Sequence, residues 1–267
     1  MKSNMVKPGM KVTLSNWDPD STGDFKGDKE DALVEIEKLT RKLTDLQEVL
    51  YAEHKHKILI VLQAMDTGGK DGTIRRVFSG INPAGVRVVS FKAPSSEELD
   101  HDYLWRIHAA TPAKGEMVIF NRSHYEDVLV VRVHQLVPKQ VWQARFDQIN
   151  AYEQYLTANG TTILKFYLHI DKNEQKARLQ ARLDDPSKHW KFRLGDLEER
   201  KLWPDYMQAY EDVLEKTRKA NASWTIVPAN HKWYRDLLIS QVLVDTLEKL
   251  NMKFPESQEN LDGIEVE

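Results

Sequence analysis

Hydrophobic residues recur along the chain in two different periods, and each period predicts one kind of element. Between residues 28 and 54, leucine and isoleucine return every three or four positions, which is typical of an amphipathic helix. The chain then changes to an unbroken aliphatic run at Lys57–Leu62, which is typical of a strand buried on both faces of a parallel sheet. The stripe of the helix can pack on its own domain or against a second subunit, because spacing alone leaves both open.

Four further apolar runs repeat the strand pattern at wide intervals, at residues 86–91, 116–120, 162–170 and 224–227. Helical patterns lie between them, at residues 71–81, 95–110, 138–158, 173–183, 196–222 and 232–250. This alternation predicts right-handed crossovers and a three-layer α/β/α fold with a parallel sheet. The economical interpretation is a single domain, 1–267, with four named parts: an N-terminal arm at 1–27, the helix at 28–54, a lid region at 184–215 and an acidic tail at 254–267.

Composition indicates a folded protein and excludes several classes of function. Hydrophobic residues make up 41% of the 267 residues, which suffices for a large core. The chain has no cysteine, so a disulfide framework, a thiolate zinc site and a catalytic thiol are excluded. No apolar run approaches the roughly 18–20 residues of a membrane span, and no signal peptide or nucleic-acid-binding motif is found. We therefore expect a cytoplasmic protein that binds neither membranes nor nucleic acids.

Charge is distributed unevenly although the net charge is only −3. The segment 70–92 has five basic residues and one acid, and the segment 176–193 has six basic residues and two acids, whereas both ends of the chain are acidic. This asymmetry favours a polyanionic ligand, and a solvated helix face of mixed charge is the alternative interpretation.

The first strand ends in a glycine-rich turn, AMDTGGKDGT at residues 64–73. In parallel sheets, ligands bind beyond the carboxyl ends of the strands, and glycines followed by a helix let backbone N–H groups surround phosphate oxygens. Lys70 is expected to reach the β- and γ-phosphates. The turn departs from GxxxxGK[ST] at Ala64 and at Asp71, and Asp66 can restore the magnesium ligand that Asp71 displaces. An ordinary βα turn is the alternative.

The third strand is followed by a second polar motif, FNRSHYEDVL at residues 120–129. Phosphate-loop enzymes usually have an acid at this place, near magnesium, but here Asn121 occupies it, with Glu126 and Asp127 one turn later. Arg122 is expected to point to the transferred phosphoryl group or to the acceptor, with an ion pair to Glu126 as the alternative. A phosphohistidine at His124 is disfavoured, because in-line transfer needs no protein nucleophile.

The last motif combines two arginines with a break in a helix. Arg178 and Arg182 are four residues apart and so lie on one helix face; the Asp-Pro at 185–186 then ends that helix, and a basic-aromatic stretch runs to Arg193. This pattern indicates a mobile lid that closes over the nucleotide and brings arginines to the phosphates. An exposed surface helix is the alternative.

Together, AMDTGGKDGT, FNRSHYEDVL and RLDDPSKHWKFRLGD (182–196) resemble the polyphosphate kinase 2 family, and most closely its class III branch, which phosphorylates AMP and ADP. The resemblance extends from about residue 5 to residue 255. It implies a thymidylate-kinase-like phosphate-loop fold with a lid, dependence on magnesium (or manganese), and inorganic polyphosphate as donor. It also implies a homodimer or homotetramer, in which the stripe of the first helix gains a partner.

The resemblance also implies roles for individual residues. The catalytic residues are Asp66, Lys70, Arg122, Glu126 and Arg178, with Glu126 compensating for Asn121. The phosphate and nucleotide ligands are Gly68, Gly69, Lys70, Asp71, Gly72, Thr73, Asn121, Arg182 and Arg193. A basic track for polyphosphate is expected from Arg75, Arg76, Lys92, Arg106 and Arg132. Magnesium is expected at Asp66 and Asp127, partly through water.

The sequence therefore leads to one main hypothesis, reversible transfer of phosphoryl groups between polyphosphate and the adenine nucleotides AMP, ADP and ATP. An ATP-dependent nucleoside or nucleotide kinase is the second hypothesis, and Asp71 in place of Ser or Thr argues against it. A polyanion-binding protein without catalytic activity is the third.

Overall fold

A computed structural model describes residues 4–220, 222–257, 259 and 266. Its centre is a five-stranded sheet in which every pairing is parallel and the strand order is β2-β3-β1-β4-β5. The strands are β1 (Lys57–Ala64), β2 (Val86–Ser90), β3 (Met117–Asn121), β4 (Thr161–His169) and β5 (Trp224–Pro228). All five strands predicted from the apolar runs are present, with ends that differ by one or two residues.

The central position of β1 brings the important turns together. Ile60 of β1 pairs with Ile119 of β3 on one side and with Leu164 of β4 on the other. The segments after β1, β3 and β4 therefore leave the same edge of the sheet side by side. These are the three segments in which the sequence motifs lie.

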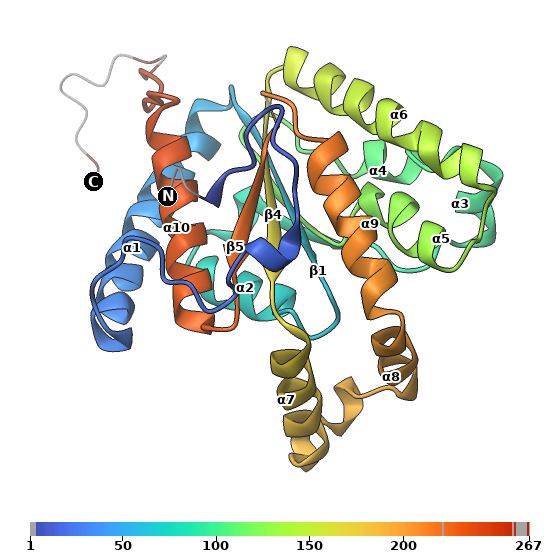
Figure 1. Ribbon diagram of the computed structural model, residues 1–267. Helices are drawn as coiled ribbons and strands as arrows, with labels where there is room; N and C mark the ends of the chain where they lie inside the picture. Colours follow the sequence, from blue (N-terminus) through green and yellow to red (C-terminus); the bar gives the residue numbers. More distant parts are fainter. Residues whose placement is uncertain (1–3, 221, 258, 260–265, 267) are drawn as a thin grey trace.

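Helices cover both faces of the sheet, so the predicted three-layer α/β/α fold is confirmed (Figure 1). One face is covered by α1 (Lys29–Glu53), α2 (Lys70–Val77) and α10 (Lys232–Glu248), and the other by α6 (Lys139–Ala158) and α9 (Trp203–Lys216). Neighbouring residues of β1 point to opposite faces: Ile58 and Ile60 pack with α1 and α10, while Leu59 and Val61 pack with α6 and α9.

The helix predicted at 28–54 begins at Asp28, whose side chain forms a capping box with Asp31. Its buried stripe, which includes Ile36, Leu39 and Leu43, packs in the core that α10 shares. The structure thus decides between the two alternatives for these residues: the stripe packs within the chain, and no second subunit is needed to cover it.

Two predicted helices are interrupted. The segment 95–110 forms two short helices, α3 (Ser96–Asp100) and α4 (Trp105–Ala109), and the segment 196–222 divides at Leu202 into α8 (Leu194–Lys201) and α9. Pro204 lies at the start of α9, where its missing N–H is tolerated, and so marks the beginning of a new helix. After β3 the chain forms a 3-10 helix, η4 (His124–Val128), and the short α5 (Val130–Val133).

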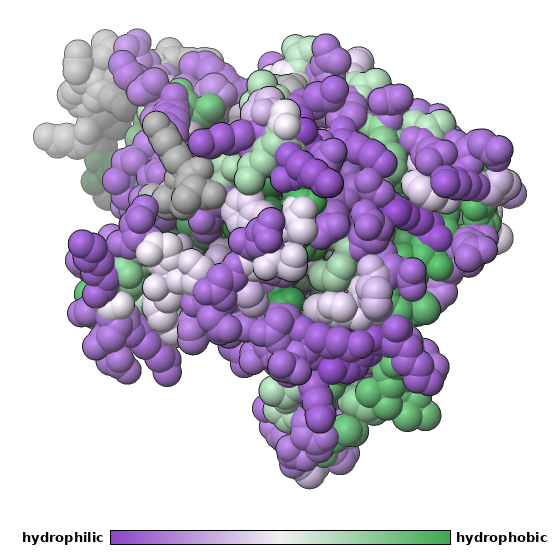
Figure 2. Space-filling view, in the orientation of Figure 1, coloured by the Kyte–Doolittle hydropathy of each residue, from purple (hydrophilic) through white to green (hydrophobic). Residues whose placement is uncertain are grey.

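The helices α7 (Lys172–Leu183) and α8 project beyond the sheet, joined by the 3-10 helix η5 (Pro186–Lys191) (Figure 1). The lid was predicted at 184–215, but α9 buries Tyr210 and Val213 in the core, so the projecting part begins with α7 and ends before α9. Apolar side chains gather on this projection around α8 (Figure 2), where Leu194 is 77% exposed.

The N-terminal arm packs on the domain, with Val6, Val12 and Leu14 buried beside α9 and β5. The backbone N–H of Leu14, in the 3-10 helix η2 (Leu14–Asn16), donates to the Glu211 carboxylate. Most of the predicted acidic tail, 254–267, lies outside the described residues. In the part of the chain that is described, no helix has the length and apolarity that a membrane span requires.

Candidate active site

The turn between β1 and α2 can be built only with glycine at two positions. A Cβ on Gly68 would lie 2.5 Å from the Ala64 Cβ and 2.8 Å from the Met65 carbonyl oxygen. Gly69 has a φ of +107°, a backbone conformation that is strained for any residue with a Cβ, and it lies against the Arg235 side chain. The segment 64–73 is called the glycine loop below; it begins at the end of β1, and from Lys70 onward it forms the first turn of α2.

Lys70 lies among three carboxylates and one arginine. Its Nζ donates to the Ala64 carbonyl oxygen at 2.8 Å. Desolvation and the nearby Arg122 lower the pKa of Lys70, while the carboxylates of Asp66, Glu126 and Asp71 oppose this shift. The structure thus brings together four of the five residues predicted to be catalytic.

Arg122 and Asp66 join the segments that follow β3 and β1. Nη2 of Arg122 donates to Oδ1 of Asp66 at 3.0 Å, so this arginine forms its ion pair with Asp66 and not with Glu126. Although desolvation acts in the opposite direction, Glu126 and Asp66 raise the pKa of Arg122. Arg122 and Thr67 each have a φ of +63°, a conformation that is strained for residues other than glycine and often found at functional sites.

Asn121, at the end of β3, donates from Nδ2 to Oδ1 of Asp71 at 2.8 Å. The two departures from the usual phosphate-loop pattern are therefore partners. A carboxylate at position 121 would face the Asp71 carboxylate and repel it.

The two acids of η4 point to different surroundings. Desolvation raises the pKa of Glu126, while Arg122 and Lys70 lower it, so Glu126 belongs to the cluster around Lys70. Asp127 instead accepts a hydrogen bond from Nη1 of Arg145 on α6, at 3.0 Å. Burial raises the pKa of Asp127 to about 6, against the attraction of Arg145. The structure therefore does not bring Asp127 together with Asp66.

Arg178 of α7 holds the glycine loop from the other side. Its Nε donates to Glu174 at 2.6 Å, its Nη1 to the Thr67 carbonyl oxygen at 3.1 Å, and its Nη2 to the carbonyl oxygens of Ala229 and Asn230. The guanidinium thus links α7, the glycine loop and the turn after β5. All its nitrogens have protein acceptors, which indicates that Arg178 positions the loop.

The other two arginines predicted for the lid belong to the projection itself. Arg182 donates from Nη1 to the Lys191 carbonyl oxygen at 3.1 Å and contacts Asp196 at 3.4 Å, so it ties the two halves of the projection to each other. Arg193 is exposed and precedes the first residue of α8.

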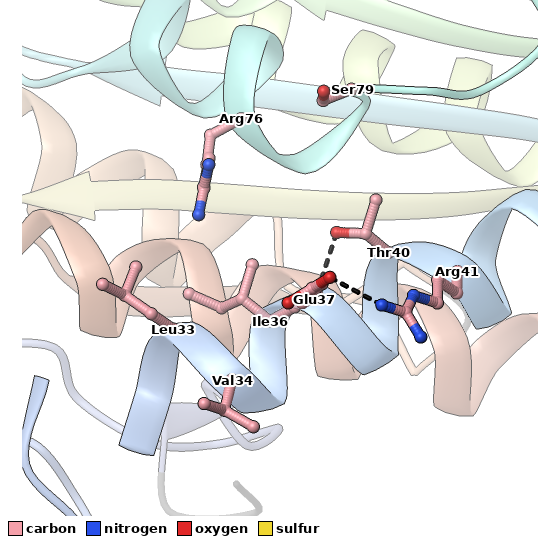
Figure 3. A pocket seen from close by; sticks show the side chains of 8 residues that line it. All are labelled: Leu33, Val34, Ile36, Glu37, Thr40, Arg41, Arg76 and Ser79. Carbon is pink, nitrogen blue, oxygen red and sulfur yellow. Dashed lines mark hydrogen bonds and ion pairs between the residues drawn. The ribbon is translucent and has the colours of Figure 1, made fainter. Parts of the chain in front are cut away.

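The basic residues predicted to form the polyphosphate track have different surroundings. Arg75 and Arg76 lie in the last turn of α2, and Arg76 faces α1 across a groove of about 470 Å³ between these helices (Figure 3). The residues that line this groove are Leu33, Val34, Ile36, Glu37, Thr40, Arg41, Arg76 and Ser79.

Two further members of that track are engaged in ion pairs. Arg106 contacts Glu98 at 3.2 Å and donates to the Lys92 carbonyl oxygen, while Arg132 contacts Asp212 at 2.6 Å. The side chain of Lys92 is exposed.

Two polar residues beside the glycine loop were missed in the sequence analysis. Arg235 of α10 is 3% exposed and lies against Gly69 and Gly72. Desolvation raises the pKa of Tyr210 on α9, and the nearby carboxylates of Glu126 and Asp66 raise it further. Neither residue is part of a recognisable motif, because both come from helices distant in sequence.

A fully buried ion pair lies beneath η4. Nζ of Lys165 on β4 donates to Glu153 at 2.6 Å, to the Tyr125 hydroxyl at 2.8 Å and to the Thr217 carbonyl oxygen at 2.8 Å. Lys165 and His124 lower the pKa of Glu153 although desolvation raises it. The sequence analysis missed this network; the signal that could have indicated it is Lys165 between the apolar residues of β4.

The donor set at the loop suits magnesium. Mg²⁺ prefers oxygen ligands and is usually held by one or two carboxylates together with substrate phosphates and waters. Asp66 is partly exposed beside Lys70 and so fits this role, with Glu126 and Asp71 in the same cluster. Within the described residues, no group of three or more His, Cys, Asp or Glu side chains is arranged to hold a metal ion, so the phosphates of a substrate would have to complete the site.

Comparisons with known proteins agree with this geometry. The family model for polyphosphate kinase 2 matches residues 26–255. The AMP/ADP-polyphosphate phosphotransferase of Meiothermus ruber is 56% identical over 267 residues and all of both chains, and the ADP-polyphosphate phosphotransferase of Rhodopseudomonas palustris is 46% identical over 96% of this chain and 92% of its own. The crystal structure of polyphosphate kinase 2 from Arthrobacter aurescens superimposes with a TM-score of 0.93 at 44% identity, covering 96% of this chain and 92% of that one. The chain therefore belongs to the polyphosphate kinase 2 family.

Proposed function

We propose that this protein transfers phosphoryl groups from inorganic polyphosphate to AMP and to ADP. The observation that carries the proposal is the cluster in which Lys70 of the glycine loop meets Arg122 and Glu126 of the segment after β3. One loop can hold the donor and the other the acceptor, and this is what in-line transfer requires. The Meiothermus ruber relative, whose name includes both AMP and ADP, supports the choice of acceptors.

The chemistry needs positioning and charge neutralisation. A terminal phosphate oxygen of the nucleotide forms a new bond to the last phosphorus atom of the polyphosphate. The bond from that phosphorus to its bridging oxygen breaks. The polyphosphate that leaves is shorter by one phosphate. Lys70 and Arg122 are placed to stabilise the negative charge that develops on the transferred group.

Asp66 is the residue best placed to hold magnesium, and its ion pair with Arg122 fixes the carboxylate. When it is bound, magnesium supplies neutralisation of charge on neighbouring phosphates. Because Asp127 contacts Arg145, we assign it to the support of η4 and propose Glu126 as the second acid of the site. Manganese is the alternative ion, since it accepts the same oxygen ligands.

The test is an assay of the purified protein with AMP, magnesium and polyphosphate in the absence of ATP. We expect ADP to appear first and ATP afterwards, as measured by chromatography of the nucleotides, and we expect the reverse reaction when ATP is supplied together with a short polyphosphate that accepts the phosphoryl group. The Lys70→Ala variant and a reaction with a metal chelator are the matched controls.

Two outcomes would reject the proposal. Turnover with ATP as donor while polyphosphate is inert would identify an ordinary nucleotide kinase. Binding of polyphosphate without transfer would identify a polyanion-binding protein. The predicted homodimer or homotetramer is tested separately, by light scattering of the purified protein.

A further inference from the structure

The projecting helices contact the glycine loop through one buried amide side chain as well as through Arg178. Gln175 of α7 is fully buried, although glutamine is usually exposed. Its Nε2 donates to the Asp66 carbonyl oxygen at 3.1 Å. A residue of the lid thus holds the backbone of the residue whose carboxylate is proposed to bind magnesium.

The other end of the same amide is held by α8. Nη1 of Arg200 donates to Oε1 of Gln175 at 2.9 Å and to the Lys172 carbonyl oxygen at 2.6 Å. Because Arg200 can only donate, it requires the amide oxygen on its side and thereby directs the amide N–H₂ group to Asp66. The orientation of Gln175 therefore depends on α8 being seated against α7.

Helix α8 is connected to the segment after β3 as well. Glu199, the neighbour of Arg200, accepts a hydrogen bond from the Tyr206 hydroxyl at 2.6 Å and lies 3.0 Å from His134, the residue that follows α5. Helix α8 thus contacts His134, in the segment after β3, and is linked to the glycine loop through Gln175.

Asp66 is consequently fixed from two directions. Gln175 holds its backbone and Arg122 its carboxylate, and the next residue, Thr67, has the strained φ of +63°. A strained backbone persists only where its surroundings determine it, and a displacement of about 1 Å at a reacting group can cost about 10²-fold in rate.

We propose that Gln175 is a positioning residue, which with Arg200 transmits the seating of α8 to the backbone of Asp66. This inference rests on the proposed function only for its kinetic consequences. Its structural part, the coupling of α8 to the glycine loop, stands on the hydrogen bonds alone.

Three variants separate the contacts. Gln175→Met keeps the length of the side chain and removes both hydrogen bonds. Gln175→Glu keeps a partner for Arg200 but cannot donate to Asp66 when it is ionised. Arg200→Met removes the contact on the α8 side. Gln180→Met is the matched control, because Gln180 is an exposed glutamine of the same helix whose side chain donates to Asp184.

The first readout is hydrogen–deuterium exchange of the segment 63–73, which needs no turnover. We expect faster exchange in all three variants and no change in Gln180→Met. The second readout is kinetic: kcat should fall by about 10- to 100-fold, which is typical for residues that orient a metal ligand, and more magnesium should be needed for half-maximal activity. The double variant of Gln175→Met and Arg200→Met should lose no more than the worse single variant, since both act through one relay.

Unchanged exchange of 63–73 in the variants would overturn the inference, as would a loss of thermal stability with the magnesium dependence unaltered. If the wild-type protein did not use polyphosphate, the proposed function would fail, while the exchange experiment would still decide whether the relay exists.

Discussion

The two sides of the glycine loop each contain an arginine but are built differently. On the reaction side, Lys70, Arg122 and Glu126 face one another and shift one another's pKa values. On the lid side, Gln175 and Arg178 donate to backbone carbonyl oxygens of the loop. Lys70 also donates to the Ala64 carbonyl oxygen, but it and Arg122 face carboxylates of the site, whereas Gln175 and Arg178 face the backbone of the loop and hold it. The same residue type thus has different roles on the two sides.

The supports of the two sides differ as well. The reaction side rests on η4 and, beneath it, on the buried pair of Lys165 and Glu153. The lid side depends on hydrogen bonds to helices that project from the domain (Figure 1). We therefore expect substitutions beneath the reaction side to affect the stability of the whole domain, and substitutions on the lid side to affect mainly the loop.

Lys70→Ala is expected to have the largest effect. It removes the cation at the centre of the reaction side, and kcat should fall by at least about 10³-fold, as for the loss of a principal group that stabilises transition-state charge. Thermal unfolding should change little. Lys201→Ala, an exposed lysine of α8, is the control and should retain wild-type kcat. Similar losses in both variants would contradict the special role of the reaction side.

Lys165→Met should destabilise the domain by about 3–5 kcal/mol, because it leaves the Glu153 carboxylate buried without its partner. Chemical denaturation would measure this loss. A double variant with Glu153→Leu should recover part of the stability, and Lys249→Met, at an exposed site, should change nothing. A single variant as stable as the wild type would show that the pair does not support η4.

Asp127 predicts a pH dependence of stability. Its pKa in the folded state is raised to about 6 by burial, from an ordinary value of 3.8, so the folded protein binds this proton more tightly than the unfolded chain. The contribution of this protonation to the free energy of unfolding is fully present below the ordinary pKa of 3.8 and is lost as the pH rises through about 6.

The Asp127→Asn variant lacks this titration. The free energy of unfolding of the wild type relative to that variant should therefore fall by up to about 3 kcal/mol between pH 4 and pH 7. Asp147→Asn, on the exposed face of α6, serves as control. A difference that stays constant with pH would contradict a raised pKa for Asp127.

Glu126→Gln is expected to give the smallest effect, a change in acceptor preference. The variant keeps the shape of the side chain and removes its charge beside Lys70 and Arg122. We expect kcat/KM with AMP to fall about tenfold more than kcat/KM with ADP, within the range seen for outer ligands of a metal site. Equal losses on both acceptors would refute this division, and Glu198→Gln, on the exposed face of α8, should alter neither.

Much of the fold and of the reaction side could be predicted, because strong local patterns determine them. The aliphatic run before the glycines predicts a central strand, and adjacent glycines followed by Lys70 predict a phosphate loop. The residues that follow β1 and β3 meet because the carboxyl ends of parallel neighbours lie at one edge.

What the sequence could not show is which way each neighbouring side chain points. Glu126 and Asp127 are adjacent, yet in a 3-10 helix successive residues turn by about 120°, so one faces Lys70 and the other Arg145. Nor could the sequence show that Arg106 and Arg132 form ion pairs with Glu98 and Asp212.

By itself, then, the sequence determined the succession of strands and helices along the chain, the glycine loop and the family. These depend on local periodicity and on short continuous motifs. Only the tertiary structure decided which charged groups face the loop and which are used to hold it. Arg235, Gln175 and the pair of Lys165 and Glu153 reach their partners from segments far away in the chain, and no local pattern records such contacts.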